Sequence, residues 1–323
     1  MRTRTLITLA VLTAGMVAAA GWSVAVRTQS VAAGMAEGPL FPGLAARVND
    51  VTRLDVAGYG GHATVARGAD GTWIVEQKDG YRADANAVKA LVVALAEARV
   101  LEPRTALPDL YGRIGVEDPE TPGAASSSVT LTGSDGARLA ALIVGKPAAP
   151  AASTLYARKV GEAPSWLVKA DLGAVETDPM RWIDQTMPRV PGDAVASVEI
   201  RQPDGRVVGI RREAPGQPFT ATGLQDDATA APAVIDQTAE AAALLTPQDV
   251  ARADPALFRD AVTTLIRRFD GGGLTVRTVR RDGQFWVTFD AAGYGGWQYR
   301  VSDAAGRALT RSPEEFAAER GQE

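Results

Sequence analysis

The chain has 323 residues, of which 46% are hydrophobic and 22% are charged, and this composition is that of a globular protein rather than a disordered one. Its 34 lysine and arginine residues are interspersed with 38 acidic residues and form no basic stripe, so we expect no nucleic-acid binding. The absence of cysteine excludes disulfides, thiolate zinc sites and a thiol nucleophile.

The first predicted element is an N-terminal hydrophobic helix. Two arginines precede an uncharged stretch at residues 5–26, and Arg27 follows it. Because about 20 apolar residues span a bilayer and flanking positive charge stays in the cytoplasm, residues 1–27 are predicted to anchor the chain in the inner membrane with its C-terminal region in the periplasm. The alternative is a cleaved signal peptide with its small-residue site at residues 18–20, which would release the protein into the periplasm.

The next region is predicted to be a tether with a short entry helix, at residues 28–50. After it, apolar and polar residues alternate in short segments that are separated by glycine-rich turns. This pattern predicts strands at residues 51–56, 62–67 and 72–77. Asp84 or Asn86 can cap a helix that ends near Arg99, because apolar residues there recur at three- and four-residue spacing.

Two hairpins and a short helix complete the first half. Turn signals such as Gly133-Ser134-Asp135-Gly136 separate apolar segments. The predicted strands lie at residues 127–131, 137–144, 154–159 and 166–169. Asp178 and Pro179 then open a short helix, with proline in its first turn. We expect these elements to form one module at residues 51–190.

The second half repeats this order at an offset of about 140 residues, without clear residue identity. Its strands are predicted at residues 196–201, 205–211, 219–222, 262–269, 274–280, 285–289 and 297–301. One helix is expected at residues 234–245, and Ser312-Pro313 begins a final one. The expected fold class is therefore α+β: an N-terminal transmembrane helix, then two similar modules, at residues 51–190 and 191–323, each a mainly antiparallel sheet with a helix packed on one face.

The residue types that usually carry chemistry form no complete motif. The single histidine, His62, falls in a predicted strand, and no nucleophile elbow accompanies it. Gly145-Lys146 lacks the remainder of a phosphate-binding loop. The paired carboxylates Glu117-Asp118 and Asp226-Asp227 are adjacent in loops, which does not give the cleft-spanning separation that glycosidases need. We therefore predict no catalytic residue, no cofactor-binding residue and no metal ligand.

Glycines and tryptophans have structural interpretations as well. Tyr59-Gly60-Gly61 and Tyr294-Gly295-Gly296 are expected at hairpin turns, where glycine supplies a positive φ. Trp22 lies near the membrane end of the predicted anchor. The other tryptophans are expected in the core, although an exposed subset would indicate a binding surface. Those residues are Trp73, Trp166, Trp182, Trp286 and Trp297.

A series of short motifs makes this chain resemble the bacterial family known as domain of unknown function 4340. The motifs follow the N-terminal anchor and are L-F-P-G-L at 40–44, V-T-R-L-D-V at 51–56, T-W-I-V-E at 72–76, A-V-K-A-L-V-V-A-L at 87–95, L-Y-G-R-I-G-V-E-D-P at 110–119, L-I-V-G-K at 142–146, L-Y-A-R-K at 155–159 and R-W-I-D at 181–184. The resemblance covers the anchor and the first module, and it reaches the second only through the repeated pattern. It carries no catalytic residue. It implies an accessory role beside the membrane subunits of an ABC transporter or an auxiliary envelope protein.

The sequence thus favours a non-enzymatic periplasmic protein, anchored through residues 5–26, that binds a protein partner or a transported substrate. The alternative is an exported hydrolase that uses Asp or Glu residues on envelope glycans, for which a cleft lined by two carboxyl groups of raised pKa would be required. A third possibility is a structural spacer between the membrane and the outer envelope.

Overall fold

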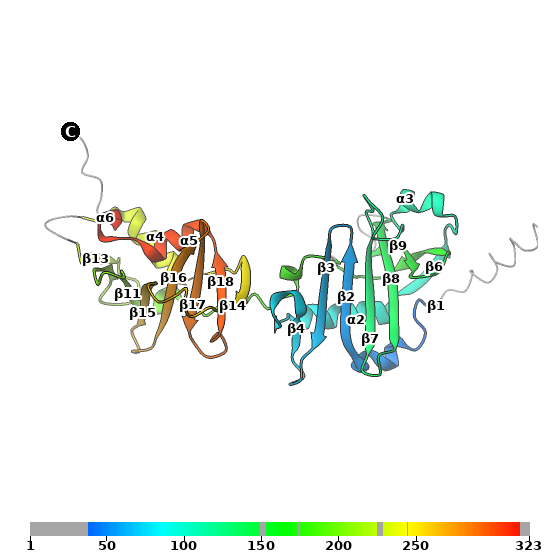
Figure 1. The fold of residues 1–323 in the computed structure, drawn as a ribbon, viewed down its shortest axis with the longest axis horizontal. Coiled ribbons are helices and arrows are strands. Elements are labelled where there is room, and N and C mark those ends of the chain that lie inside the picture. The colour runs from blue at the N-terminus through cyan, green and yellow to red at the C-terminus, as the bar shows by residue number, and fades with distance from the viewer. Residues whose placement is uncertain (1–37, 149–152, 174, 225–228, 244, 317–323) are drawn as a thin grey trace, which may run out of the picture. The chain divides into compact units, whose positions relative to one another are not determined.

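The computed structural model describes residues 38–148, 153–173, 175–224, 229–243 and 245–316. The predicted membrane anchor at residues 1–27 lies outside the described residues, and so does Trp22. The chain divides into two compact units (Figure 1). The first holds the chain up to Val75 together with Ala83–Trp182, and the second holds Glu76–Arg82 together with the chain from Ile183 onward. This division lies between residues 182 and 183, whereas the sequence pattern suggested a boundary at 190.

The first sheet has ten strands in the order β1-β6-β10-β9-β8-β7-β2-β3-β4-β5. All neighbouring pairs from β1 to β4 are antiparallel. The strands are β1 Gly38–Pro39, β2 Val51–Gly58, β3 Gly61–Arg67, β4 Trp73–Val75, β5 Tyr81–Arg82, β6 Arg99–Pro103, β7 Ser127–Gly133, β8 Arg138–Pro147, β9 Thr154–Lys159 and β10 Ser165–Lys169. β5 belongs to the Glu76–Arg82 segment, which is part of the second unit.

The main helix of the first unit is α2, Ala85–Glu97, which runs across the strands of the first sheet (Figure 1). Asp84 is its N-cap, because the Asp84 carboxylate accepts hydrogen bonds from the backbone N–H groups of Asn86 and Ala87. The apolar residues of α2 at three- and four-residue spacing are buried, as the sequence predicted: Val88, Leu91, Val92 and Leu95. The shorter helices are η1 Leu44–Asp50, η3 Pro108–Leu110, α3 Tyr111–Ile114 and η4 Pro179–Arg181.

The second sheet has eight antiparallel strands in the order β13-β12-β11-β15-β16-β17-β18-β14. The strands are β11 Val195–Arg201, β12 Val207–Arg211, β13 Thr220–Thr222, β14 Asp249–Arg252, β15 Val262–Arg268, β16 Gly273–Arg281, β17 Gln284–Asp290 and β18 Trp297–Val301. The helices of this unit are η2 Glu76–Lys78, η5 Gly192–Ala194, α4 Pro232–Ala243, α5 Asp303–Thr310 and α6 Pro313–Phe316.

The two sheets share one strand order, which confirms the repeat that the sequence pattern indicated. Eight strands of the first sheet run β6-β10-β9-β8-β7-β2-β3-β4, and the second runs β14-β18-β17-β16-β15-β11-β12-β13. When the eight strands of each series are numbered in chain order, strands with the same number occupy the same position in the two sheets. The fold class is therefore α+β with two mainly antiparallel sheets, as expected.

Several elements of the structure were not predicted. They are β1, β5, β6, β14, α3 and α5. β6 and β14 are short strands without a clear apolar alternation, and β6 is largely exposed. They become strands because β10 and β18 offer free backbone hydrogen-bonding groups beside them. A pairing of this kind leaves no local hydrophobic pattern in the sequence.

The second sheet has one covered face and one open face. Alternate residues of its strands are buried on the covered face, among them Val198, Ile200, Ile210, Ile266, Val276, Phe285 and Val287. Helices α4, α5 and α6 are grouped over the strands on that side (Figure 1). The hydroxyl of Thr264 donates to the backbone oxygen of Leu309 in α5, at 2.8 Å, which places α5 on the same face as the buried residues.

Candidate functional site

The residues considered for chemistry are not brought together. His62 is exposed on β3 and pairs with Ala57 of β2 only through the backbone ladder. Asp118 accepts a hydrogen bond from Arg158, so it serves a structural contact. The pair Asp226-Asp227 lies outside the described residues. Within the described ranges, no group of three or more His, Asp or Glu side chains could hold a metal ion.

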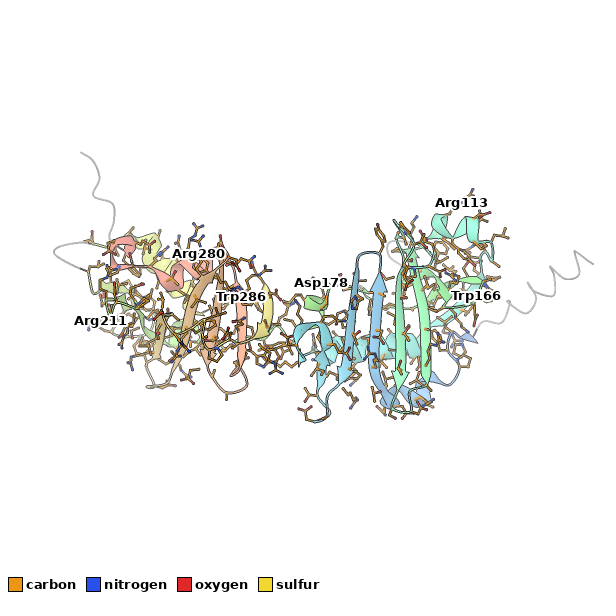
Figure 2. The ribbon with its side chains drawn as sticks, viewed as in Figure 1. Arg113, Trp166, Asp178, Arg211, Arg280 and Trp286 are labelled. Atoms are coloured by element: carbon orange, nitrogen blue, oxygen red, sulfur yellow. The ribbon has the colours of Figure 1, made fainter. Side chains whose placement is uncertain are left out.

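The tryptophans correct one expectation. Of the five that were expected in the core, only Trp182 is fully buried, and the other four are partly exposed: Trp73, Trp166, Trp286 and Trp297. Trp286 stands between the buried residues Phe285 and Val287 of β17, so the pleat directs it to the opposite face of the sheet (Figure 2). None of these four is fully exposed, so they do not form the exposed subset that would indicate a binding surface.

Three of the sequence motifs meet at Arg158 in the first unit. The residue is only 5% exposed, and its Nε donates to the Val116 oxygen at 2.9 Å. One terminal nitrogen donates to the Glu162 oxygen at 3.1 Å and the other to Asp118 at 2.6 Å. The guanidinium also lies over the ring of Tyr111, 4.6 Å from its centroid. Arg158 therefore fixes the loop at residues 110–119 against β9.

Glycine and lysine of the L-I-V-G-K motif complete this junction. A Cβ on Gly145 would lie 2.6 Å from the Ile114 oxygen and 2.8 Å from the Gly115 oxygen, so only glycine allows this approach. Lys146 donates through Nζ to the Gly112 oxygen at 3.1 Å, at the C-terminal end of α3. The motifs that carry the family resemblance thus have a packing role, and none of these residues forms a catalytic arrangement.

An aromatic cluster gathers in the second unit around Tyr81, which the Glu76–Arg82 segment supplies. The Tyr81 ring meets Trp297 edge-on, with centroids 4.8 Å apart, and Tyr299 at 5.9 Å. Burial raises the pKa of both tyrosines. Their hydroxyls are 3.4 Å apart. The guanidinium of Arg252 stacks on Trp297 at 3.9 Å from the ring centroid. Because its members are buried or paired, this cluster anchors the segment and offers little surface to a ligand.

The open face of the second sheet carries an accumulation of arginine. Exposed arginines of β11, β12, β15 and β16 point to this side, and we call four of them the basic face: Arg201, Arg211, Arg267 and Arg277. Arg281, at the end of β16, points to the same side but is not counted in it. Arg211 and Arg267 both lie beside Ser197 in the strand register. They are therefore two strand spacings apart, about 10 Å. Figure 2 marks Arg211 and Trp286 on this sheet.

The basic face has few internal partners. Arg201 pairs with Glu199 at 2.8 Å. The side chains of Arg211, Arg267 and Arg277 make no hydrogen bond or ion pair with the described residues. The connection that follows β14 reaches the same face. There, Phe258 joins Arg277 and others in lining a cavity of about 430 Å³. The chain as a whole has a net charge of −4, so this positive patch is a local departure from the average.

The family model described as domain of unknown function 4340 matches residues 73–260, which is more than half of the chain. The chain belongs to the domain of unknown function 4340 family. The 4340 match starts at β4, so the motifs at 40–44 and 51–56 lie outside it. It continues into the second unit, further than the motifs alone indicated, and it includes Arg201 and Arg211 of the basic face. No curated protein and no solved structure matches this 4340 chain.

None of the helices within the described ranges of this 4340 protein is both long enough and apolar enough to cross a membrane. The predicted anchor precedes those ranges.

Proposed function

We propose that this chain is a non-enzymatic, membrane-anchored periplasmic accessory protein that binds an acidic surface of an envelope protein, such as a membrane subunit of an ABC-type transporter. The observation that carries the proposal is the basic face. Three of its arginines have no partner among the described residues, so their positive charge is not compensated on this face. An acidic partner would supply the missing opposite charge and would be steered toward the face.

The composition of the surface supports a protein as the occupant. Arginine and tryptophan are enriched at protein interfaces, and Trp286 lies on the same face as the four arginines. The helices α4, α5 and α6 occupy the other face, so the strands from β12 to β16 can present their side chains outward. The resemblance to proteins encoded beside transporter subunits supplies the class of partner, and the arginines supply its charge.

The alternative of an Asp- or Glu-dependent hydrolase finds no supporting observation. A general acid of that kind needs a carboxyl group of raised pKa. Where the pKa of a described carboxyl group is clearly displaced, it is lowered in every case: Asp70, Asp135, Asp184, Asp204 and Glu314. We therefore propose only the binding function.

The test is affinity capture of the tagged full-length chain from native membranes in mild detergent, with the captured proteins identified by mass spectrometry. We expect transporter membrane subunits to be captured. Replacing Arg211, Arg267 and Arg277 by glutamine should reduce their recovery about tenfold, since each exposed ion pair contributes up to about 1 kcal/mol.

The matched control replaces three other exposed arginines by glutamine: Arg113, Arg138 and Arg189. Both triple variants lose the same positive charge, so equal losses in both would show a non-specific effect and contradict the basic face. A second control removes residues 1–27. It should release the protein from the membrane, and a full-length chain that is already free of membranes would contradict the anchor.

A further inference from the structure

A second cavity lies on the covered side of the second unit, away from the basic face. Its volume is about 700 Å³, within the range of small-molecule sites. Thr278 and Arg280 of β16 and Phe285 of β17 form one wall. The C-terminal half of α5, with Arg307, and the residue after it, Arg311, form the other. The cavity is therefore lined by apolar residues, by three arginines and by two carboxylates, those of Asp260 and Glu315.

The three arginines converge from two elements. Arg307 lies on α5 and Arg311 follows the last residue of α5, four positions later, and like charges at this spacing repel each other. Arg307 is balanced only by Asp303, at 3.6 Å and with both side chains exposed. Arg280 extends from β16 (Figure 2). Its Nε donates to the Gly283 oxygen at 3.4 Å, and its guanidinium lies over the Phe285 ring, 5.5 Å from the centroid. Two of the three positive charges are thus weakly compensated within the described part of the chain.

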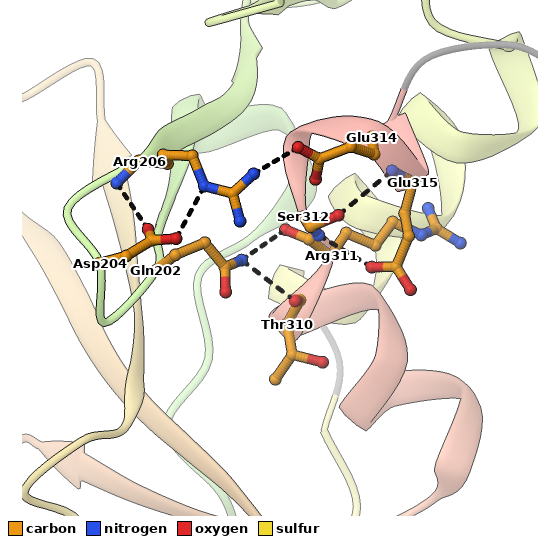
Figure 3. A network of polar contacts seen from close by, with 8 residues as sticks. All are labelled: Gln202, Asp204, Arg206, Thr310, Arg311, Ser312, Glu314 and Glu315. Carbon is orange, nitrogen blue, oxygen red and sulfur yellow. Dashed lines mark hydrogen bonds and ion pairs between the residues drawn. The ribbon is translucent and has the colours of Figure 1, made fainter.

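Arg311 has the most unusual surroundings. It is half-buried, and its guanidinium donates only to neutral oxygens: those of Val234 at 2.9 Å, Thr238 at 3.5 Å and Gln237. Burial lowers the pKa of Arg311, and the charge of Glu315 acts in the opposite direction. The Glu315 carboxylate itself accepts the backbone N–H of Ser312 at 2.8 Å (Figure 3). An anion in the cavity would therefore stabilise a positive charge that the protein leaves without an ion pair.

The position of Arg311 is fixed by the contacts around it. Gln202, in the turn after β11, donates to the backbone oxygens of Thr310 at 3.2 Å and Arg311 at 2.8 Å (Figure 3). Ser312 and Glu315 form a capping box that begins α6. The backbone that carries Arg311 is thus held before any ligand arrives, which lowers the entropic cost of binding.

Thr278 supplies an independent observation. The residue is 1% exposed, it lines this cavity, and its Oγ1 has no hydrogen-bond partner among the residues that the structure describes. A buried hydroxyl without a partner is destabilising, and such groups mark places where a ligand or a water is expected. It comes from the same strand as Arg280, two residues earlier on the same face.

We propose that this cavity binds a phosphate monoester that carries an apolar substituent. Guanidinium groups bind phosphate oxygens in pairs, and the three arginines outnumber the two carboxylates of the lining, so the cavity favours an anionic group. The Thr278 hydroxyl donates to one of these oxygens, and the apolar substituent lies against Phe285. The proposal is independent of the partner proposed above, because the basic face lies on the other side of the sheet.

The test is calorimetric titration of the full chain in mild detergent with phenyl phosphate, inorganic phosphate and dihexanoyl phosphatidic acid. We expect phenyl phosphate to bind more tightly than inorganic phosphate. Arg307→Gln and Arg280→Gln should each weaken binding about tenfold or more, as the loss of a charge-assisted hydrogen bond implies. The matched control is Arg281→Gln, because Arg281 is exposed on the same strand and points to the opposite face. It should leave the affinity unchanged.

Thr278→Val separates a binding role from a structural one. If the hydroxyl is unpaired in the free protein, the variant should unfold at a higher temperature and yet bind phenyl phosphate more weakly. If phosphatidic acid is the only probe that binds, and Arg307→Gln and Arg280→Gln weaken its binding, the proposal stands with a lipid as the source of the phosphate. Absence of binding by all three probes, or binding that the arginine variants leave unchanged, would overturn it.

Discussion

At the scale of single residues, burial decides which charged groups matter for stability. Arg158 and Asp118 form one ion pair, but their side chains are 6% and 74% exposed. The exposed carboxylate can exchange its partner for water at little cost. The buried guanidinium also donates to two backbone oxygens, and the bond to the Val116 oxygen is buried, so removing the guanidinium leaves that oxygen without a donor. The two halves of this pair should therefore differ in their effect on folding.

We predict that Arg158→Met lowers the free energy of unfolding by about 3 kcal/mol, because it leaves the buried Val116 oxygen without a donor. Asp118→Asn should cost less than about 1 kcal/mol. Urea unfolding followed by circular dichroism would measure both. Equal effects of the two substitutions would show that the ion pair, and not the backbone contacts of Arg158, holds this loop.

At the scale of elements, α5 illustrates how packing overrides local preference. Gly306 lies inside this helix, where alanine would ordinarily be more favourable by about 1 kcal/mol. A Cβ at Gly306 would, however, overlap the ring of Phe285 on β17. The close approach of α5 to the sheet therefore requires glycine at this position.

We expect Gly306→Ala to lower the unfolding free energy by about 1–3 kcal/mol, because overpacking displaces α5 from the sheet. Combining it with Phe285→Leu should recover part of the loss, since the smaller side chain makes room for the methyl group. Gly295→Ala is the control, as no atom lies within 4 Å of the added Cβ. A thermal melt of the four proteins tests this, and an unchanged Gly306→Ala protein would contradict the described packing.

At the scale of the whole molecule, the chain order and the spatial grouping differ at one segment. Glu76–Arg82 precedes α2 in sequence but belongs to the second unit. Tyr81 packs against Trp297 and Tyr299 there, and Arg82 pairs with Asp184 at 2.7 Å. Lys78 adds an ion pair with Asp249 at 2.7 Å. The two units therefore repeat the same strand order, but they are not two continuous stretches of the chain, because the Glu76–Arg82 segment from the first half belongs to the second unit.

The Arg82–Asp184 pair makes the stability of the second unit depend on pH. Partial burial acts to raise the pKa of the Asp184 carboxyl, but hydrogen bonds from Thr186 and Arg82 outweigh it, so the pKa is lowered. A carboxyl group whose pKa is lowered by folding stabilises the folded state at every pH above its pKa in the unfolded chain, about 3.9. This contribution disappears as the pH falls through the pKa of the group in the folded protein.

We predict that Asp184→Asn lowers the unfolding free energy at pH 7 by about 1 kcal/mol or less, because the pair is partly exposed. The difference from the natural protein should vanish as the pH falls from about 4 to about 2. Urea titrations across this range, followed by tryptophan fluorescence, measure it. Asp282→Asn is the exposed control and should leave the stability unchanged at every pH.

The sequence by itself determined the strands, the turns, the α+β class and the repeat, because alternation of apolar residues and turn chemistry are local properties of the chain. It also indicated Asp84 as a helix cap and Ser312 as the start of α6. It could not find β6 or β14, because these short strands lack a clear apolar alternation and form by pairing with the backbones of β10 and β18.

The tertiary structure alone decided where arginines gather. Arg211 and Arg267 are far apart in sequence and become neighbours only when β11 pairs with both β12 and β15. Likewise, Arg280 and Arg311 line one cavity only because α5 packs over β16 and β17. Charge clusters of this kind depend on strand register and helix packing, which are set by long-range contacts, and so no local sequence pattern reveals them.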